Sequence, residues 1–370
     1  MKVCLRTLLT AVVFAGAGEG SDQISSDSGL EVYIRQALGK QKGTLKEEDF
    51  ARLECLHARP GDMADLEGIQ QATSLTILQL QGHAIHELAP LAQLRRLVEL
   101  DLQDNQVADL QPLHRLQKLQ VLNMTSNQIR DLEPLAGLEQ LTVLRLGSNQ
   151  IRDLIPLNGL IRLVELRLSS NQIRDLAPLA LLTQLQKLNL ADNQVRDLAP
   201  LVRLLQLNSL KLPDNQIRDL TPLTRLENLR ALTLSTNHIE DLAPLSRLSG
   251  LQQLRLAANQ IEDVTPLVRL TGLNELRLPH NRIRDLESLA GLAQLEVLDL
   301  GHNQVEDLTP LAGLHQLEVL QVPGNQISDL APLMELEQLS ALDIWNNPLS
   351  QTATNRQIPA LQARGVEIRW

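Results

Sequence analysis

The sequence predicts an α/β fold built as a solenoid, a coil of stacked and nearly identical repeats. Twelve asparagines recur every 22 residues without a slip, from Asn105 to Asn347. Leucine fills the first and fourth positions of thirteen regular repeats, of which the first begins at Leu75. A residue that returns at a fixed short period across most of a chain indicates stacked structural units. The 370 residues therefore need no single central core, because each repeat packs on its neighbours.

The first residues of the chain have the pattern of an export signal. Lys2 and Arg6 precede a stretch without charge that ends in small residues at Ala17. Such a pattern is typical of a cleaved signal peptide, which we place at residues 1–17. Retention in the cytoplasm is the alternative. No later stretch approaches the roughly 20 apolar residues of a membrane span, so no transmembrane segment is expected.

The first half of each repeat predicts one short strand. Its leucines alternate with other residues at a period of two, so the leucines point inward and the intervening side chains outward. Twenty-two residues leave room for a short strand and a return, and successive strands can lie parallel about 4.8 Å apart. The asparagine follows the strand, where its amide can donate and accept hydrogen bonds along the stack. An earlier repeat beginning at Leu53 is degenerate, with Gly61 in place of the asparagine.

One aspartate per repeat opens the second half. Its carboxylate can cap exposed amides at the entry to a tight helical turn. A calcium site is the alternative, but calcium needs several oxygens that converge on one point, so we expect caps. The column comprises Asp109, Asp131, Asp153, Asp175, Asp197, Asp219, Asp241, Asp263, Asp285, Asp307 and Asp329. Arginines that precede five of them are expected to form a solvated ladder, with charges offset by these carboxylates.

The pattern LxxLxLxxNxIxDLxPLxxL resembles the leucine-rich repeats of bacterial internalin-like proteins, over residues 75–347. The resemblance implies a right-handed leucine-rich repeat solenoid, with a curved parallel sheet on the concave face and short 3-10 or turn segments on the convex face. Residues 18–74, with LEVYIRQALGKQKGTLKEEDFARLECLHA, look like the helical N-terminal cap of such arrays, followed by the degenerate first repeat. Residues 348–370 resemble their C-terminal cap, with a helix near 356–363 and a strand at 366–370.

Composition and motifs argue against several functions. A net charge of −10 disfavours nucleic acid, whose phosphates need a basic surface. No glycine-rich phosphate loop, GxSxG elbow or HExxH pair is present, and an open sheet offers no dry pocket for catalysis. His280 and His302 share the eighth position of neighbouring repeats, so their rings can approach, but two ligands are too few for zinc. We therefore predict neither an enzyme nor a cofactor or metal site.

The outward strand positions carry the candidate site. In the fifth position of the repeat, basic residues gather at the centre of the array, on a chain that is acidic overall. The predicted partner-binding residues are Arg145, Arg167, Lys211, Arg255 and Arg277. Glu165 and Glu275 partly neutralise Arg167 and Arg277, and the face lacks the aromatic anchors of strong binding sites. The hypothesis is a band that docks a protein partner with an acidic segment, or an anionic glycan; the alternative is drift among solvated positions.

These observations lead to one functional hypothesis and two alternatives. The first is a monomeric, non-enzymatic protein-protein interaction scaffold, exported by a bacterium and acting as a secreted or cell-envelope protein. The second is an intracellular leucine-rich repeat regulatory subunit of the phosphatase-binding type, which the DLxPL signature and the N-terminal cap disfavour. The third is a structural spacer, which would show no preferred face.

Overall fold

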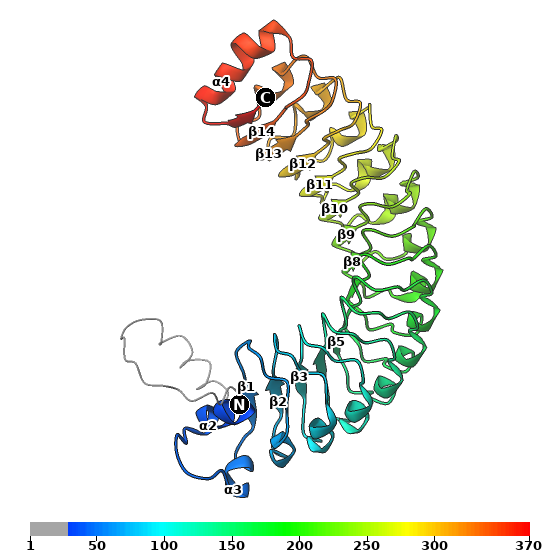
Figure 1. The fold of residues 1–370 in the computed structure, drawn as a ribbon. Helices are drawn as coiled ribbons and strands as arrows, with labels where there is room; N and C mark the ends of the chain where they lie inside the picture. The colour runs from blue at the N-terminus through cyan, green and yellow to red at the C-terminus, as the bar shows by residue number, and fades with distance from the viewer. Residues whose placement is uncertain (1–28) are drawn as a thin grey trace, which may run out of the picture. The chain divides into compact units, whose positions relative to one another are not determined.

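The computed structural model describes residues 29–370, so the predicted signal peptide at residues 1–17 lies outside the described residues. The described residues divide into two compact units, 29–173 and Arg174–Trp370, which we describe separately. In both units the strands lie on one side and short 3-10 turns lie on the other (Figure 1).

The N-terminal unit begins with two helices, α2 (Leu30–Leu38) and α3 (Glu47–Phe50). Its strands are β1 (Cys55–His57), β2 (Ile77–Gln79), β3 (Glu99–Asp101), β4 (Val121–Asn123), β5 (Val143–Arg145) and β6 (Glu165–Arg167). Between them lie the 3-10 turns η1 (Ile69–Gln71), η2 (Ala89–Gln93), η3 (Gln111–Arg115), η4 (Glu133–Leu135) and η5 (Ile155–Leu157). Each strand pairs in parallel with the next one along the chain, residue by residue at a spacing of 22, as Leu78 does with Leu100. The degenerate repeat at Leu53 therefore contributes a full strand, β1.

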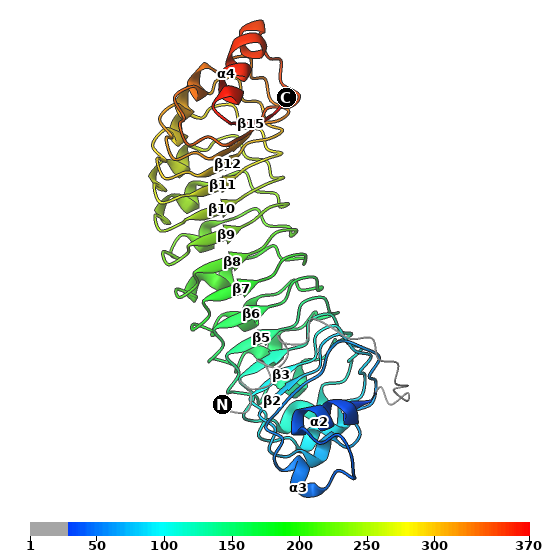
Figure 2. The same ribbon diagram turned by 90° about the vertical axis from the view of Figure 1, so that its left-hand side faces the viewer.

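The C-terminal unit continues the same pattern and ends differently. Its strands are β7 (Lys187–Asn189), β8 (Ser209–Lys211), β9 (Ala231–Thr233), β10 (Gln253–Arg255), β11 (Glu275–Arg277), β12 (Val297–Asp299), β13 (Val319–Gln321), β14 (Ala341–Asp343) and β15 (Glu367–Arg369). Its 3-10 turns are η6 (Ala177–Leu179), η7 (Ala199–Arg203), η8 (Thr221–Leu223), η9 (Ala243–Arg247), η10 (Thr265–Arg269), η11 (Glu287–Leu289), η12 (Thr309–Leu311) and η13 (Ala331–Leu333). The strands lie side by side in chain order (Figure 2). The predicted helix near 356–363 is present as a π-helical turn, η14 (Ala353–Gln357), that continues into α4 (Ile358–Ala363), and the last strand, β15, pairs with β14.

Leucine layers and an asparagine ladder hold the repeats together, as predicted. The inward side chains, such as Leu122 and Leu254, are fully buried. In the repeat of Asn127, the amide nitrogen Nδ2 donates to the carbonyls of Leu102, at 2.9 Å, and of Met124, at 3.1 Å, while Oδ1 accepts the Val107 N–H at 2.9 Å. The side chain thus satisfies backbone groups of its own repeat and of the preceding one, which no apolar residue could do.

The aspartate column forms caps, also as predicted. Oδ1 of Asp131 accepts the backbone N–H of Glu133, the first residue of η4, at 2.9 Å. All eleven aspartates of the column make the same bond to the residue two positions on. This bond satisfies an amide that the short turn leaves without an internal partner. The arginines that precede the aspartates are exposed, as expected of a solvated ladder, and Nε of Arg130 and of Arg152 donates to the glutamine of the next repeat, both at 2.8 Å.

Candidate functional site

The predicted partner-binding residues all end a strand and project from the strand face. Each occupies the third residue of its strand, one step beyond a buried leucine, and alternation along the strand turns it outward. Arg145 and Arg167 belong to the N-terminal unit, and Lys211, Arg255 and Arg277 to the C-terminal unit. Lys211 is exposed. The four arginines are organised into two clusters of the same design.

In the N-terminal unit, one buried glutamate holds two arginines. Oε1 of Glu165 accepts Nε of Arg145 and Nε of Arg167, both at 2.8 Å. The glutamate side chain is only 11% exposed, whereas that of Arg167 is 51% exposed. With two arginines and one glutamate, this cluster carries a net charge of +1.

The C-terminal unit repeats the arrangement 110 residues later. Arg255 binds Glu275 through two parallel bonds, Nε to Oε1 at 2.9 Å and Nη2 to Oε2 at 3.0 Å, and Nε of Arg277 donates to the same Oε1 at 2.5 Å. Burial alone would raise the pKa of Glu275, but the hydrogen bonds from Arg255 and Arg277 outweigh burial and lower that pKa. Glu275 therefore stays ionised, and these three side chains together carry a net charge of +1, with the carboxyl group of Asp299 next to Arg277 in the sheet.

The two glutamates limit what the clusters can bind. The sequence indicated that each glutamate neutralises one arginine, but each binds two, one of them from the preceding repeat. An arginine presents five N–H donors, so the donors not used by the glutamate remain for a ligand. Their planar arrangement matches carboxylate, phosphate or sulfate oxygens. Each cluster can thus serve as a small anion-binding point with fixed guanidinium positions.

The two histidines of the eighth position lie close together, as the repeat spacing predicted. The rings of His280 and His302 are stacked, with centroids 4.3 Å apart and planes 9° apart. Beside them, burial raises the pKa of Asp299, against the opposing effect of the Gly301 backbone N–H that it accepts. Across residues 29–370, no group of three or more His, Cys, Asp or Glu side chains is arranged to hold a metal ion.

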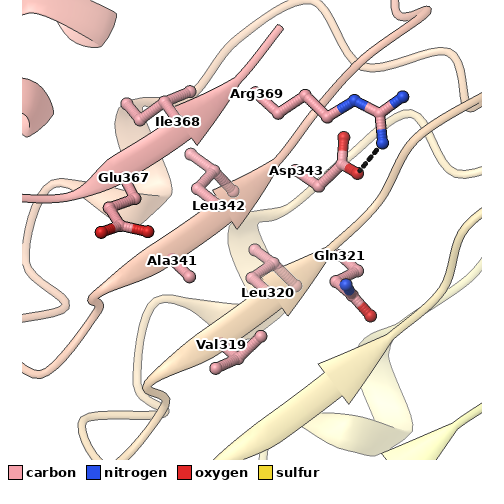
Figure 3. A pocket seen from close by; sticks show the side chains of 9 residues that line it. All are labelled: Val319, Leu320, Gln321, Ala341, Leu342, Asp343, Glu367, Ile368 and Arg369. Atoms are coloured by element: carbon pink, nitrogen blue, oxygen red, sulfur yellow. Dashed lines mark ion pairs between the residues drawn. The ribbon is translucent and has the colours of Figure 1, made fainter.

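A second feature of the strand face was missed in the sequence. Trp345 is 47% exposed and follows β14 at the seventh, outward position of the last regular repeat. The expectation that this face lacks aromatic anchors is therefore wrong at its C-terminal end. The signal was available, because the seventh position is an outward one and Trp345 is the aromatic residue that fills it. Beside it, the last three strands line a hollow (Figure 3).

Parallel strands at a 22-residue spacing, buried leucine layers and an asparagine ladder define a leucine-rich repeat protein, a class of protein-interaction scaffolds. A family model described as Leucine Rich repeats (2 copies) matches residues 95–137, 139–181 and 271–313. An internalin (inlF) from Listeria monocytogenes is 33% identical, with a TM-score of 0.84 over 86% of this chain and 95% of that one. The chain therefore belongs to the internalin-like leucine-rich repeat proteins.

Two further solved structures frame this assignment. Internalin C2 (inlC2) from Listeria monocytogenes is 36% identical, with a TM-score of 0.52 over 62% of this chain and 92% of that one. The plant peptide hormone receptor RGFR1, solved in complex with RGF2, shares the fold at 18% identity and a TM-score of 0.59, over 78% of this chain and 62% of that one. A search of curated proteins finds no match. Within residues 29–370, no helix is both long and apolar enough to cross a membrane.

Proposed function

We propose that this protein is a non-enzymatic scaffold that binds an acidic segment of a partner protein on its strand face. The observation that supports this most directly is the pair of Arg–Glu–Arg clusters, with Lys211 exposed between them in the sequence, on a chain of net charge −10. A chain that is acidic overall but presents cations at one outward position of its repeat has the charge pattern of a surface for anionic groups.

The clusters are suited to recognition because their guanidinium groups are held in place. Glu165 and Glu275 fix the arginine side chains before a ligand arrives, so less rotamer freedom is lost on binding. A carboxylate of the partner would accept two N–H bonds from one guanidinium. The same leucine-rich repeat fold is bound to a peptide hormone in the RGFR1 complex with RGF2, which makes a peptide segment a reasonable ligand class here.

The proposal includes export and a domain plan. We propose a signal peptide at residues 1–17, an N-terminal cap at 18–74, the repeat array at 75–347 and a C-terminal cap at 348–370, in a protein that acts as a monomer outside the cell or in its envelope. The likeness to an internalin of Listeria monocytogenes supports this location. Sequencing of the mature N-terminus tests it: a start near Gly18 is expected, and a retained Met1 would favour the intracellular alternative.

The binding test uses a defined acidic probe, a fluorescein-labelled peptide of alternating Glu and Gly. The clusters are removed in a variant with Arg145→Gln, Arg167→Gln, Arg255→Gln and Arg277→Gln. The control carries Arg130→Gln, Arg152→Gln, Arg196→Gln and Arg218→Gln, which changes the net charge equally but alters the arginines that precede the aspartate caps. Fluorescence anisotropy is expected to show binding about tenfold weaker or more for the cluster variant, and an almost unchanged affinity for the control.

The outcomes separate site-specific binding from general attraction. Equal losses in both variants would mean that any positive charge serves, and the proposal would be abandoned. Circular dichroism confirms that the cluster variant is folded before its binding is interpreted. A heparin-derived oligosaccharide forms a second arm: binding of this glycan through the same arginines, without binding of the peptide, would replace the protein segment by an anionic glycan.

A further inference from the structure

The last three strands line a shallow, open hollow that differs in chemistry from the arginine clusters. Its volume is about 330 Å³, and it is lined by three successive residues from each of β13, β14 and β15 (Figure 3). Leu320 and Leu342, in the middle of their strands, are buried, so the outward neighbours form the two rims. Small-ligand sites measure about 300–1,000 Å³, so this hollow admits one or two side chains rather than a folded domain.

The two rims differ in polarity. Val319 and Ala341 form an apolar rim, which ends at Glu367 on the outer strand. The opposite rim is polar and consists of Gln321, Asp343 and Arg369. Two carboxylates and one guanidinium leave the hollow with a net charge of −1, the opposite sign to the Arg–Glu–Arg clusters. A side chain with an apolar stem and a cationic head fits this division.

Arg369 shows how such a head would be held. Its Nη1 lies 3.5 Å from Oδ2 of Asp343, and its guanidinium carbon lies 5.7 Å from the ring centroid of Trp345. The other carboxylate oxygen of Asp343 accepts the backbone N–H of Trp345 at 3.1 Å, which fixes the carboxylate beside the indole. The Arg369 side chain is 71% exposed, and exposed ion pairs of this kind hold weakly. A cation from outside can therefore compete for Asp343 and for the indole face.

We propose that this hollow binds an extended segment of a partner protein that carries a lysine or arginine next to apolar residues. The cationic head would lie against Asp343, near Trp345, and the aliphatic stem would cross the hollow towards Val319 and Ala341. The inference rests on the proposed scaffold function but uses different residues. Within the C-terminal unit, the positive cluster on β10 and β11 and the negative hollow on β13 to β15 would give a bound segment a fixed direction, with its acidic part on β10 and β11 and its basic part on the last strands.

The chain provides its own reporter for this surface. Its two tryptophans are Trp345 and Trp370, so the variant Trp370→Phe leaves Trp345 as the single indole. The probes are two short peptides without tryptophan or tyrosine, acetyl-Gly-Val-Arg-Val-Arg-Gly-amide and the same peptide with glutamate in place of arginine. Titration at 150 mM salt is expected to change the Trp345 fluorescence saturably with the arginine peptide and not with the glutamate peptide.

Three further variants in the Trp370→Phe background sharpen the test. Asp343→Asn with Glu367→Gln removes both carboxylates and is expected to weaken binding about tenfold, since charge-assisted contacts dominate. Glu335→Gln with Glu337→Gln removes two exposed carboxylates outside the hollow and should leave binding unchanged. Arg369→Gln frees Asp343 and the indole, so it is expected to tighten binding of the arginine peptide severalfold.

Each contrary outcome has one meaning. No saturable change up to about 10 mM peptide, with Arg369→Gln included, would show that the hollow does not bind cations. A response to a neutral oligosaccharide such as maltohexaose, without one to the arginine peptide, would make it a sugar site. Equal responses to both peptides would show that charge is irrelevant. The scaffold proposal itself is tested separately, by the anisotropy assay with the four-arginine variant.

Discussion

The inner repeats and the first regular repeat solve the same packing problem differently at one position. In the inner repeats, an asparagine side chain bonds the backbone of its own repeat and of the preceding one, as Asn127 does. In the first regular repeat, this position is His83, which is 7% exposed and whose two ring nitrogens have no hydrogen-bond partner among residues 29–370. The repeat before it has Gly61 there, and the Tyr33 ring from α2 packs edge-on against His83 at 6.3 Å. Asparagine thus occupies the ladder position in repeats that lie between two regular repeats. Next to the N-terminal end, other residues occupy this position.

Substitution of an asparagine in the inner ladder is expected to have the largest effect on stability. Asn215 donates from Nδ2 to the carbonyls of Leu190, at 2.9 Å, and Pro213, at 3.0 Å, and accepts the Val195 N–H at 2.9 Å. Asn215→Ala leaves these buried backbone groups without partners, so the free energy of unfolding should fall by about 3 kcal/mol or more. Urea denaturation followed by circular dichroism measures the loss.

The matched control is Asn158→Ala, which removes an exposed asparagine outside the ladder. Its effect should stay within about 0.5 kcal/mol, as for most surface substitutions. A loss below about 1 kcal/mol for Asn215→Ala would contradict the comparison. The inner position would then need the hydrogen bonds of asparagine no more than the position of His83 does.

The first regular repeat predicts a pH effect of intermediate size. Burial lowers the pKa of His83, and the backbone of Gly61 and the carboxylate of Asp62 offset this only in part. Because the pKa in the folded state lies below that of the unfolded chain, about 6.5, the unfolded state binds more protons as the solution is acidified. The contribution of neutral His83 to the free energy of unfolding is therefore fully present above about pH 6.5. It is lost as the pH falls from there through the pKa of the folded state.

His83→Asn restores the residue used in the other repeats and removes the titrating group. We expect this variant to be about 1 kcal/mol more stable than the wild type near pH 5 and to lose the pH dependence between 5 and 7. Thermal denaturation at several pH values measures both. His83→Gln, which is uncharged but shaped differently from asparagine, separates the two effects: it should remove the pH dependence without the full gain in stability. A variant series with the same pH slope as the wild type would show that His83 is not the titrating group.

Most of the fold could be predicted from the sequence because the same residues recur at the same positions in each repeat. The leucine positions, the asparagine ladder and the aspartate caps each depend on residues within one repeat or its neighbour, so the period alone places them. The candidate site was only partly predictable. Which glutamate oxygen meets which arginine depends on side-chain conformations between strands, as with Glu275 and Arg255.

The C-terminal hollow was hidden from the sequence by a break in the period. Arg369 lies beside Asp343 in the sheet, but 26 residues separate them rather than 22, because α4 and the preceding turn intervene before β15. Counting by 22 from Asp343 gives Gly365, so a column analysis cannot bring Arg369 next to Trp345. The regular array was predictable from its period, and the ends, where the period fails, required the structure.

The aspartate caps predict the smallest effect, and they test whether exposed positions follow the same logic as the buried ladder. Asp219 accepts the Thr221 N–H at 2.8 Å, and the hydrogen bonds from the Thr221 hydroxyl and backbone lower the pKa of Asp219. A lowered pKa means that this cap stabilises the fold above the unfolded-state pKa of about 3.9 and that its contribution is lost as the pH falls through the lower folded-state value. Asp219→Ala should lower the free energy of unfolding by about 1 kcal/mol or less at pH 7, and by less still near pH 3.

Asp175→Ala is the matched control, because Asp175 caps Ala177, which offers a backbone N–H at 2.8 Å but no hydroxyl. Urea denaturation at pH 7 should therefore show a smaller loss for Asp175→Ala, and equal losses would assign the whole effect to the backbone bond that all the caps share.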